Sequence, residues 1–277
     1  MVYIADITDD RALIHSGPVL GNHDRKILTS TNLEDVADFW EMQYLPNKEK
    51  EWPSLRLNAL DAFSKLEDFV IPKKSSPLRL LDFGCGWGFD LLAAKEKGWE
   101  LYGIEPLPAC AVYARMRNDA IILTDTLRDD SYPPDFFDCI TAFQVFEHLP
   151  DPDAELTRLY HMMVEGGVLL IEVPNIETWS VSVLRERHRH FVQDHINFFS
   201  KTTLGKLMQS VGFEVVEAYY PSRKMALSHL TETWGPRFLP QRLAGVFSSI
   251  LSKVKLRDKI ISLNFGDVIA LIARKPV

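Results

Sequence analysis

Three glycines at alternate positions follow an apolar run directly in this 277-residue chain. The run covers residues 80–83, and the glycines are Gly84, Gly86 and Gly88. Glycine takes positive φ at low cost and lets a ligand approach the main chain, and a helix that follows presents its free N–H groups. A strand, a glycine turn and a helix in this order predict a cradle for a nucleotide.

The spacing of these glycines narrows the choice of ligand. A dinucleotide-binding fingerprint would place its third glycine or alanine at position 89, where this chain has Phe89. The third glycine here is Gly88, so a nicotinamide cofactor is the least favoured ligand. Glu105 ends the next apolar run, 100–104. Its carboxylate can accept hydrogen bonds from both hydroxyls of a ribose.

The pattern D-x-G-C-G-x-G over residues 82–88, with Glu105 ending the next strand, resembles the class I S-adenosylmethionine-dependent methyltransferases. The resemblance implies that S-adenosyl-L-methionine is the cofactor and S-adenosyl-L-homocysteine the product, with Glu105 on the ribose. It also implies that four loop residues contact the methionyl and ribose parts, namely Asp82, Gly84, Cys85 and Gly86.

Two later segments complete the cofactor site that the resemblance implies. Asp125 and Thr126 follow a third predicted strand, where the family contacts the adenine. The alternatives in the same loop are Asp129, Asp130 and Asp135. Gln144 ends the fourth predicted strand and is expected to face the methionyl group, because ligands of open sheets lie outside the carboxyl ends of the strands.

Glu147 and His148 stand just before a proline turn, Pro150-Asp151-Pro152, and this segment resembles the family's E-H-x-x-D-P motif. Two interpretations stay open for the pair. Either side chain could reach the methyl acceptor, or the pair could fix the geometry of the loop.

A second histidine segment contains Asp194-His195 and, shortly after, Phe198-Phe199-Ser200. A histidine near neutral pH can take the proton that an acceptor loses, and an adjacent carboxylate can tune it. The segment resembles E-H-x-x-[FY]-F-S of bacterial sugar and small-molecule methyltransferases, including deoxysugar C-methyltransferases in which the histidine is a candidate base. This chain has Asp for Glu and lacks the cysteine-rich zinc domain of those sugar enzymes.

The candidate catalytic residues are therefore His195, Asp194 and His148. A structural role for His195, in which its ring bonds the loop to the sheet edge, stays open. His188 and His190 have the spacing of a metal-binding pair, but no third ligand stands out, so we expect no metal.

These residues lie at the ends of strands that alternate with helices along the predicted chain. This alternation predicts an α/β fold with a Rossmann-like, seven-stranded, mostly parallel sheet and helices on both faces. The family resemblance implies an antiparallel last strand. The expected strands after the first are 100–104, 120–123, 137–143, 168–173, 213–219 and 268–273. Ser200 is the expected N-cap of a helix over 201–210.

We expect two domains. Residues 1–76 form an N-terminal helical lid, with helices over 33–45 and 54–70 separated by Pro46 and Pro53. Residues 77–277 form the cofactor-binding domain, with a helical insertion at 221–265 before the last strand. Three aromatic residues of the lid either line the acceptor pocket or anchor the core, namely Phe39, Trp40 and Tyr44.

The insertion is basic and amphipathic over residues 237–259. The segment contains six Lys or Arg residues and only one Asp, and its apolar residues recur at helical spacing. Such a helix either rests on an anionic lipid surface or packs its apolar stripe on the sheet domain or a second subunit. Possible contact with a membrane surface is thus one expectation, and the oligomeric state is not predicted.

The bulk composition is that of an ordinary globular protein, 46% hydrophobic and 25% charged. The chain shows no signal-peptide pattern and no membrane-spanning run, so we expect it in the cytoplasm. A net charge of −7 argues against nucleic acid as a partner. The three cysteines fit neither a disulfide set nor a zinc site, and we interpret Cys85, Cys110 and Cys139 as small hydrophobic residues.

Together these features predict a methyltransferase that moves a methyl group to oxygen or carbon of a small or carrier-linked acceptor. A sugar of a glycan or glycolipid pathway is the first expectation, and a quinone or lipid-like compound is the alternative. A partner protein that binds S-adenosylmethionine without turnover is the hypothesis from a different class, since a fold alone does not identify a substrate.

Overall fold

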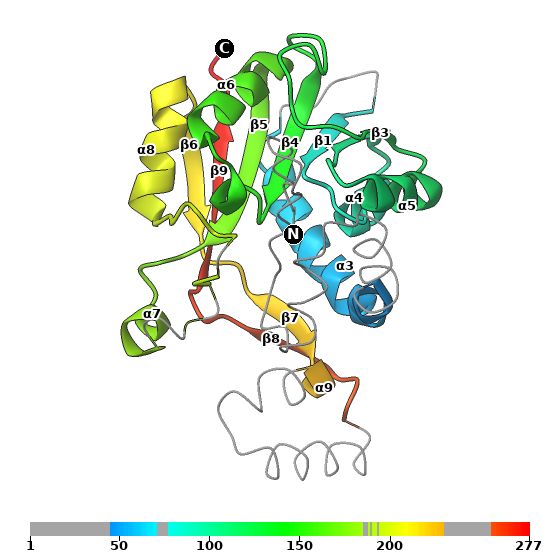
Figure 1. Cartoon of the computed structure of the whole chain (residues 1–277), viewed down its shortest axis with the longest axis vertical. Helices are drawn as coiled ribbons and strands as arrows, with labels where there is room; N and C mark the ends of the chain where they lie inside the picture. The colour runs from blue at the N-terminus through cyan, green and yellow to red at the C-terminus, as the bar shows by residue number, and fades with distance from the viewer. Residues whose placement is uncertain (1–44, 71–76, 185–187, 189, 193, 230–255) are drawn as a thin grey trace, which may run out of the picture.

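The computed structural model describes residues 45–70, 77–184, 188, 190–192, 194–229 and 256–277. Its centre is the predicted seven-stranded sheet, with strand order β3-β2-β1-β4-β5-β9-β6 (Figure 1). The strands are β1 Arg79–Phe83, β2 Glu100–Ile104, β3 Ile121–Leu123, β4 Phe137–Phe143, β5 Met163–Pro174, β6 Glu214–Tyr219 and β9 Val268–Arg274. Each predicted strand is present, with ends shifted by up to five residues.

Strand β9 is antiparallel to both of its neighbours, as the family resemblance implied. Ala273 pairs with Leu169 of β5 on one side and with Val215 of β6 on the other. The pairs β1–β2, β1–β4, β2–β3 and β4–β5 are all parallel. The predicted fold class is therefore confirmed, and the carboxyl ends of the parallel strands meet at one edge.

Helices cover both faces of the sheet (Figure 1). One layer contains α3 Leu45–Glu67, α4 Phe89–Lys95 and α5 Pro108–Asn118, and the other contains α6 Pro152–Met162 and α8 Lys201–Val211. Ser200 caps α8 as predicted, since its hydroxyl accepts the N–H of Thr203. Asp151 caps α6 in the same way through the N–H of Ala154.

Alternating side chains of the central strands belong to two hydrophobic clusters, one under each helical layer. In β5, Leu169 and Ile171 join the cluster under α6 and α8, whereas Val168 and Leu170 join the one under α3, α4 and α5. Successive side chains of a strand point to opposite faces, so a strand that is covered on both sides becomes apolar throughout. Because both faces of the sheet are buried, its strands form a rigid support for the residues at their carboxyl ends.

The expected break between two lid helices is wrong. Pro46 and Pro53 both lie in one continuous helix, α3, which includes Pro53 in its interior. Pro46 occupies the first turn, where a missing N–H leaves no intrahelical bond unmade. Burial of Ala59, Phe63 and Leu66 against the sheet layer favours the helix beyond Pro53. The part of the lid over residues 1–44, with Phe39, Trp40 and Tyr44, lies outside the described residues.

The insertion at 221–265 begins and ends in strands that we did not predict. Strand β7, Arg223–Ala226, pairs antiparallel with β8, Ile260–Leu263, at the lower end of the view in Figure 1. A short helix, α9 Leu227–His229, follows β7. Asn58 of α3 bonds both the N–H and the carbonyl of Lys224, which holds β7 against α3. Most of the predicted basic helix lies outside the described residues.

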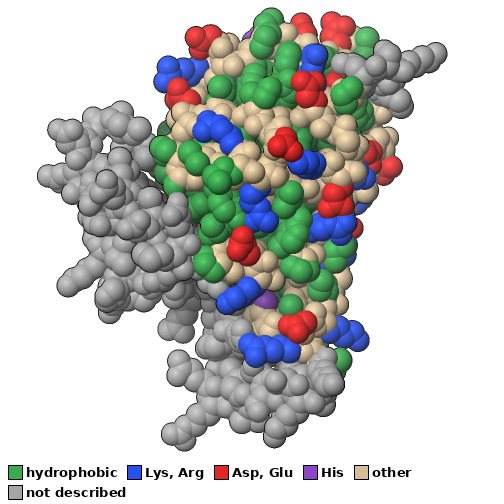
Figure 2. Space-filling model, turned by 90° about the vertical axis from the view of Figure 1, so that its right-hand side faces the viewer, with side chains coloured by type: hydrophobic (Ala, Val, Ile, Leu, Met, Phe, Trp, Pro, Cys, Tyr) green, Lys and Arg blue, Asp and Glu red, His purple; other side chains and the backbone are tan. Residues whose placement is uncertain are grey.

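The outer surface mixes charged and apolar side chains. On the face shown in Figure 2, Lys and Arg side chains lie among Asp and Glu side chains and scattered hydrophobic ones. Exposed ion pairs such as Lys95–Asp119 and Arg117–Glu49 connect helices of the layer that contains α3, α4 and α5. Within the described part of the chain, no helix has both the length and the apolar character needed to cross a bilayer.

Candidate functional site

The glycine loop lies at the carboxyl end of β1. Gly84, Gly86 and Gly88 have φ values of 78°, 51° and 72°, in the left-handed region that glycine adopts most easily. The N–H groups of Gly84 and Cys85 both donate to the carbonyl of Ile104 at the end of β2. The loop is thus held between the ends of two strands, at the start of α4, as the sequence predicted.

Glu105 lies directly under this loop and is 1% exposed. One carboxylate oxygen accepts the N–H of Gly86 at 2.9 Å, and the other accepts the N–H of Leu107 at 2.9 Å. A carboxylate offers about four lone-pair positions, so two remain for ribose hydroxyls. Burial raises the pKa of Glu105 to about 7, against the lowering effect of the two N–H donors.

Asp82 is buried at the end of β1. Thr141 of β4 donates its hydroxyl to Oδ1 of Asp82 at 3.0 Å, while Oδ2 is buried and has no hydrogen-bond partner among the described residues. Burial, together with the nearby carboxylate of Asp90, raises the pKa of Asp82 to about 8. A buried, unsatisfied oxygen is costly, and it fits the cationic groups of a bound sulfonium amino acid.

The predicted adenine contacts lie in the exposed loop after β3. Asp125 accepts the N–H of Thr126 and pairs with Arg128 at 2.8 Å. Of the alternatives, Asp135 precedes β4 and bonds Lys275, which places it at the opposite edge of the sheet from the glycine loop. Asp129 pairs with Arg158 of α6. The role of Asp125 and Thr126 stays a prediction.

Gln144 lies in a left-handed conformation, φ 57°, immediately after β4. Its main-chain N–H donates to the carbonyl of Glu172 of β5, and its side-chain amide donates to the Glu172 carboxylate at 3.3 Å. Arg223 of β7 lies 3.6 Å from the same carboxylate. A non-glycine residue with positive φ is uncommon and is concentrated at functional sites. The main chain and the side chain of this positive-φ residue are thus both bonded to Glu172.

The two histidine segments, predicted separately, meet at this edge. The carbonyl of Glu147 accepts the N–H groups of both Ile196 and Asn197, at 2.9 and 3.0 Å. The side-chain amide of Asn197 donates to the carbonyl of Leu149 at 2.6 Å. These bonds attach the loop at 194–197 to the turn at 146–149, which is a single 3₁₀ turn, η2 Phe146–His148.

His148 and His195 face each other across this junction. Their ring centroids are 4.8 Å apart in an edge-to-face arrangement. Nδ1 of His148 lies 2.8 Å from the main-chain oxygen of Asp194 and 3.7 Å from its carboxylate. The three predicted catalytic residues, His195, Asp194 and His148, are therefore brought together, with Asp194 beside the ring of His148.

Glu147 completes the group, which we call the edge cluster (Glu147, His148 and His195). One ligand-type atom from each of the three side chains lies within 4.8 Å of the others. Burial raises the pKa of Glu147 to about 8 and lowers the pKa of His148 to about 3. Uncharged forms of both side chains are thus favoured in their buried positions.

His188 and His190 lie behind this junction. Nε2 of His188 lies 2.9 Å from the hydroxyl of Ser180 in α7, Trp179–Leu184. Nε2 of His190 lies 3.5 Å from the carboxylate of Asp267, which precedes β9. The two histidines therefore link the loop to two neighbouring segments, and the expectation that they bind no metal stays a prediction.

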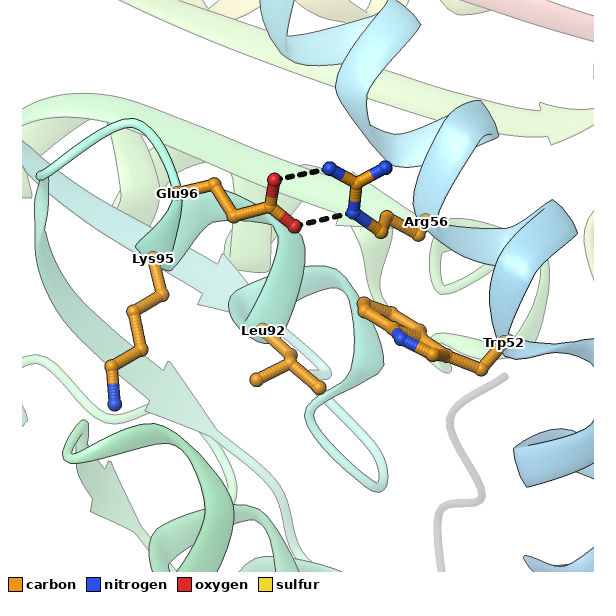
Figure 3. A pocket seen from close by; sticks show the side chains of 5 residues that line it. All are labelled: Trp52, Arg56, Leu92, Lys95 and Glu96. Carbon is orange, nitrogen blue, oxygen red and sulfur yellow. Dashed lines mark hydrogen bonds and ion pairs between the residues drawn. The ribbon is translucent and has the colours of Figure 1, made fainter.

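A shallow hollow of about 380 Å³ lies between α3 and α4 (Figure 3). Trp52 and Arg56 line it from α3, and Leu92 and Glu96 from α4, with Arg56 and Glu96 joined by two hydrogen bonds. None of its lining residues belongs to the glycine loop or the edge cluster. Its charged groups are paired, and we assign it a role in holding α3 on α4.

Sequence reasoning missed three residues that shape the site. Glu172 is the one acidic residue within the apolar stretch 168–173, a signal that was available. Thr141 and Asn197 carry no such signal, because their partners lie 59 and 48 or more residues away.

The comparisons with known proteins agree with this geometry. The family described as a methyltransferase domain matches residues 55–218, more than half of the chain. The chain belongs to this family. The predicted family and the predicted cofactor, S-adenosyl-L-methionine, are confirmed, and the glycine loop, Asp82 and Glu105 fit that cofactor by their chemistry.

Curated relatives match the methyltransferase domain in part. A ubiquinone biosynthesis O-methyltransferase of Psychrobacter arcticus is 29% identical over 157 residues, which are 49% of this chain and 58% of that protein. One from Rhodopseudomonas palustris is 32% identical over 104 residues, 36% of this chain and 41% of that protein. The chain thus spans less than two thirds of the length of these relatives.

Solved structures share the fold at low identity. A methyltransferase from Archaeoglobus fulgidus superimposes with a TM-score of 0.55 at 20% identity, covering 84% of this chain and 100% of that one. A methyltransferase from Thermotoga maritima gives 0.54 at 18% identity, covering 87% and 98%. These matches show the methyltransferase fold and no more.

Proposed function

We propose that this methyltransferase-family chain transfers a methyl group from S-adenosyl-L-methionine to an oxygen of a small, hydroxylated acceptor that lies against the edge cluster. The observation that carries the proposal is the junction of the two histidine segments at the carboxyl edge. It places His148 and His195 on the same edge as the glycine loop and Gln144, where ligands of open sheets bind.

The reaction needs positioning more than chemical assistance. The cofactor supplies a methyl group on a positively charged sulfur. An acceptor lone pair forms the new bond to the methyl carbon as the bond to sulfur breaks with its electron pair, and the acceptor proton passes to the edge cluster. Asp82, Glu105 and the glycine loop orient the donor, and the buried side chains of Val145 and Phe146 next to Gln144 limit the access of water.

His195 is the side chain that we propose to receive this proton. His148 is less suited, because burial holds its pKa at about 3 and its Nδ1 faces the Asp194 carbonyl. A phenolic hydroxyl has a pKa of about 10 and is within reach of a histidine base, whereas a sugar hydroxyl holds its proton more tightly. This chemistry favours a phenol or quinol acceptor.

Two observations bear on the class of acceptor. The relatives named as ubiquinone biosynthesis O-methyltransferases support a quinol-like acceptor. The segment Asp194 to Ser200, with its resemblance to sugar and small-molecule methyltransferases, supports a sugar as the second candidate, with oxygen or carbon as the methylated atom. A carrier-linked form of either acceptor is compatible with an open sheet edge.

The test is transfer of a labelled methyl group from S-adenosyl-L-methionine to two acceptor panels, dihydroxybenzenes and nucleotide-linked sugars. We expect transfer to the first panel, at least about 100-fold weaker in His195→Ala, with affinity for S-adenosyl-L-homocysteine unchanged. His161→Asn, an exposed histidine of α6, is the matched control. Cofactor binding without transfer to either panel would instead support a binding partner that lacks turnover.

A further inference from the structure

The edge cluster contains a buried carboxylate that makes no hydrogen bond to the described residues. Glu147 is 1% exposed, and neither of its carboxylate oxygens has a hydrogen-bond partner among the described residues. Nε2 of His148 is buried and likewise without such a partner. Buried polar atoms are normally bonded to protein, water or an ion, and each exception requires an explanation. Glu147 and His148 are adjacent in the sequence, so a single bound group would explain the unbonded atoms of both.

We propose that Glu147, His148 and His195 bind one divalent transition-metal ion of the Zn²⁺ class. Their ligand atoms lie within 4.8 Å of one another. In a tetrahedral site with bonds of 2.0–2.2 Å, two ligand atoms are about 3.4 Å apart. To coordinate one ion, the ligand atoms would therefore have to come closer to one another by roughly an ångström.

The donor set selects the class of ion. Two imidazole nitrogens and one carboxylate suit Zn²⁺ and its first-row neighbours, whereas Mg²⁺ and Ca²⁺ prefer oxygen ligands. Catalytic zinc sites commonly have two histidines and one glutamate, with a further position open to water or substrate. Among the described residues the edge cluster supplies three protein ligands, which would leave the further position to water or substrate.

The surroundings of His148 support the same conclusion. Its Nδ1 lies 2.8 Å from the carbonyl oxygen of Asp194, which can only accept a hydrogen bond. Nδ1 therefore carries the proton, and Nε2 presents a lone pair to the cluster. Ligating histidines usually donate their other N–H to a carbonyl or a carboxylate, which fixes the ring for the metal.

Main-chain contacts also bring the segments that carry the other two ligands together before any ion arrives. The main-chain carbonyl of Glu147 binds the N–H groups of Ile196 and Asn197, so the carboxylate and the ring of His195 come from two segments joined by hydrogen bonds. A site assembled by the fold loses less conformational entropy on binding than one that must be gathered by the ion. The 3₁₀ turn and the loop thus form a prepared site.

This inference deepens the proposed function and rests on it for the role of the ion. At the open position, the ion would hold an acceptor oxygen and lower the pKa of its hydroxyl, so the proton could leave to solvent. His195 then acts as a ligand, whereas without an ion it receives the proton directly. A metal requirement would also favour acceptors with two adjacent hydroxyls.

Direct metal binding tests the site independently of activity. The full chain is stripped with a chelator and titrated with Zn²⁺ by calorimetry and with Co²⁺ by visible absorption. We expect one ion per chain and the Co²⁺ bands of a four- or five-coordinate site. Glu147→Gln and His195→Asn should each weaken Zn²⁺ binding by at least about 100-fold, because each removes a direct ligand.

Controls separate this proposal from the proposed function. Glu165→Gln and His161→Asn change exposed residues of the same types and should bind Zn²⁺ like the wild type. Unchanged affinity for S-adenosyl-L-homocysteine shows that a variant is folded. The metal site is overturned if the wild type binds no ion, or if both ligand variants bind it normally. If the metal-free protein then still transferred methyl groups, the proposed function would remain supported without the metal site.

Discussion

Nδ1 of His148 and the main-chain oxygen of Asp194 are 2.8 Å apart, although 46 residues separate them in the chain. The contact attaches a loop that follows β5 to a turn that follows β4. It also fixes which nitrogen of His148 carries the proton. The acceptor side of the site therefore depends on how well these two segments stay joined.

Removing the amide of Asn197 should loosen that junction. Asn197→Ala loses bonds to the carbonyls of Leu149 and Phe146. At about 1 kcal/mol per bond, the free energy of unfolding should fall by about 1–2 kcal/mol. We expect methyl transfer to fall about tenfold or more, since misplacement of catalytic groups is costly. Calorimetry should show unchanged binding of S-adenosyl-L-homocysteine, and an equal loss in both assays would contradict a local role.

Glu105 should make cofactor affinity depend on pH. Its pKa is raised to about 7, and ribose hydroxyls bind best to the ionised carboxylate, so affinity should rise as pH rises through 7. Between pH 6 and pH 8 the expected gain is about tenfold. Calorimetric titration with S-adenosyl-L-homocysteine measures it. Glu105→Gln should bind weakly with a flat profile, and a pH dependence that survives in this variant would assign it to another group.

Asp82 should make stability fall with rising pH. Its pKa is raised to about 8 in the fold from 3.8, so the folded chain keeps a proton that the unfolded chain has lost. Between these two values the folded state binds more protons, and stability therefore decreases as pH rises. Asp82→Asn cannot ionise, and its denaturation midpoint should change less between pH 5 and pH 8.5. Parallel midpoints for both proteins would argue against a buried proton on Asp82.

Gly88 and Gly98 form a matched pair for testing the packing of the glycine loop. Both have φ 72°, but a Cβ at Gly88 would lie 2.4 Å from Nδ2 of Asn118, while a Cβ at Gly98 meets open space. Alanine at Gly98 should cost about 1–2 kcal/mol from backbone conformation alone. Alanine at Gly88 should cost about 1–3 kcal/mol more from overpacking. Ala114 would also be in the way, with its Cβ at 2.8 Å, so equal losses by chemical denaturation would show that α5 gives way at both Asn118 and Ala114.

The sheet and the donor half of the site were predictable because their signals are local. An apolar run followed by glycines specifies both β1 and the turn after it, and Glu105 follows the next run by the same logic. The clustering of Glu147 with His195 was not predictable. Each segment was recognised, yet their approach depends on main-chain bonds to residues 194–197 that no pattern of side chains encodes.

The errors have physical causes as well. Pro46 and Pro53 were expected to separate two helices, but one helix runs through both prolines. The burial of Ala59, Phe63 and Leu66 stabilises it, and this packing outweighs the loss of one hydrogen bond at Pro53. Strands β7 and β8 are only four residues long, so their alternation was too short to stand out. Their pairing depends on each other and on Asn58.

The antiparallel strand β9 determines where this enzyme family can vary at little cost. Since β6 ends at the carboxyl edge and β9 begins there, the chain leaves the sheet and re-enters it at the edge that carries the candidate site. A segment of any length can be exchanged at this point without altering strand order or either hydrophobic cluster. Grafting the 221–265 segment between related chains would therefore test whether acceptor preference moves with this segment while the donor-binding half stays constant.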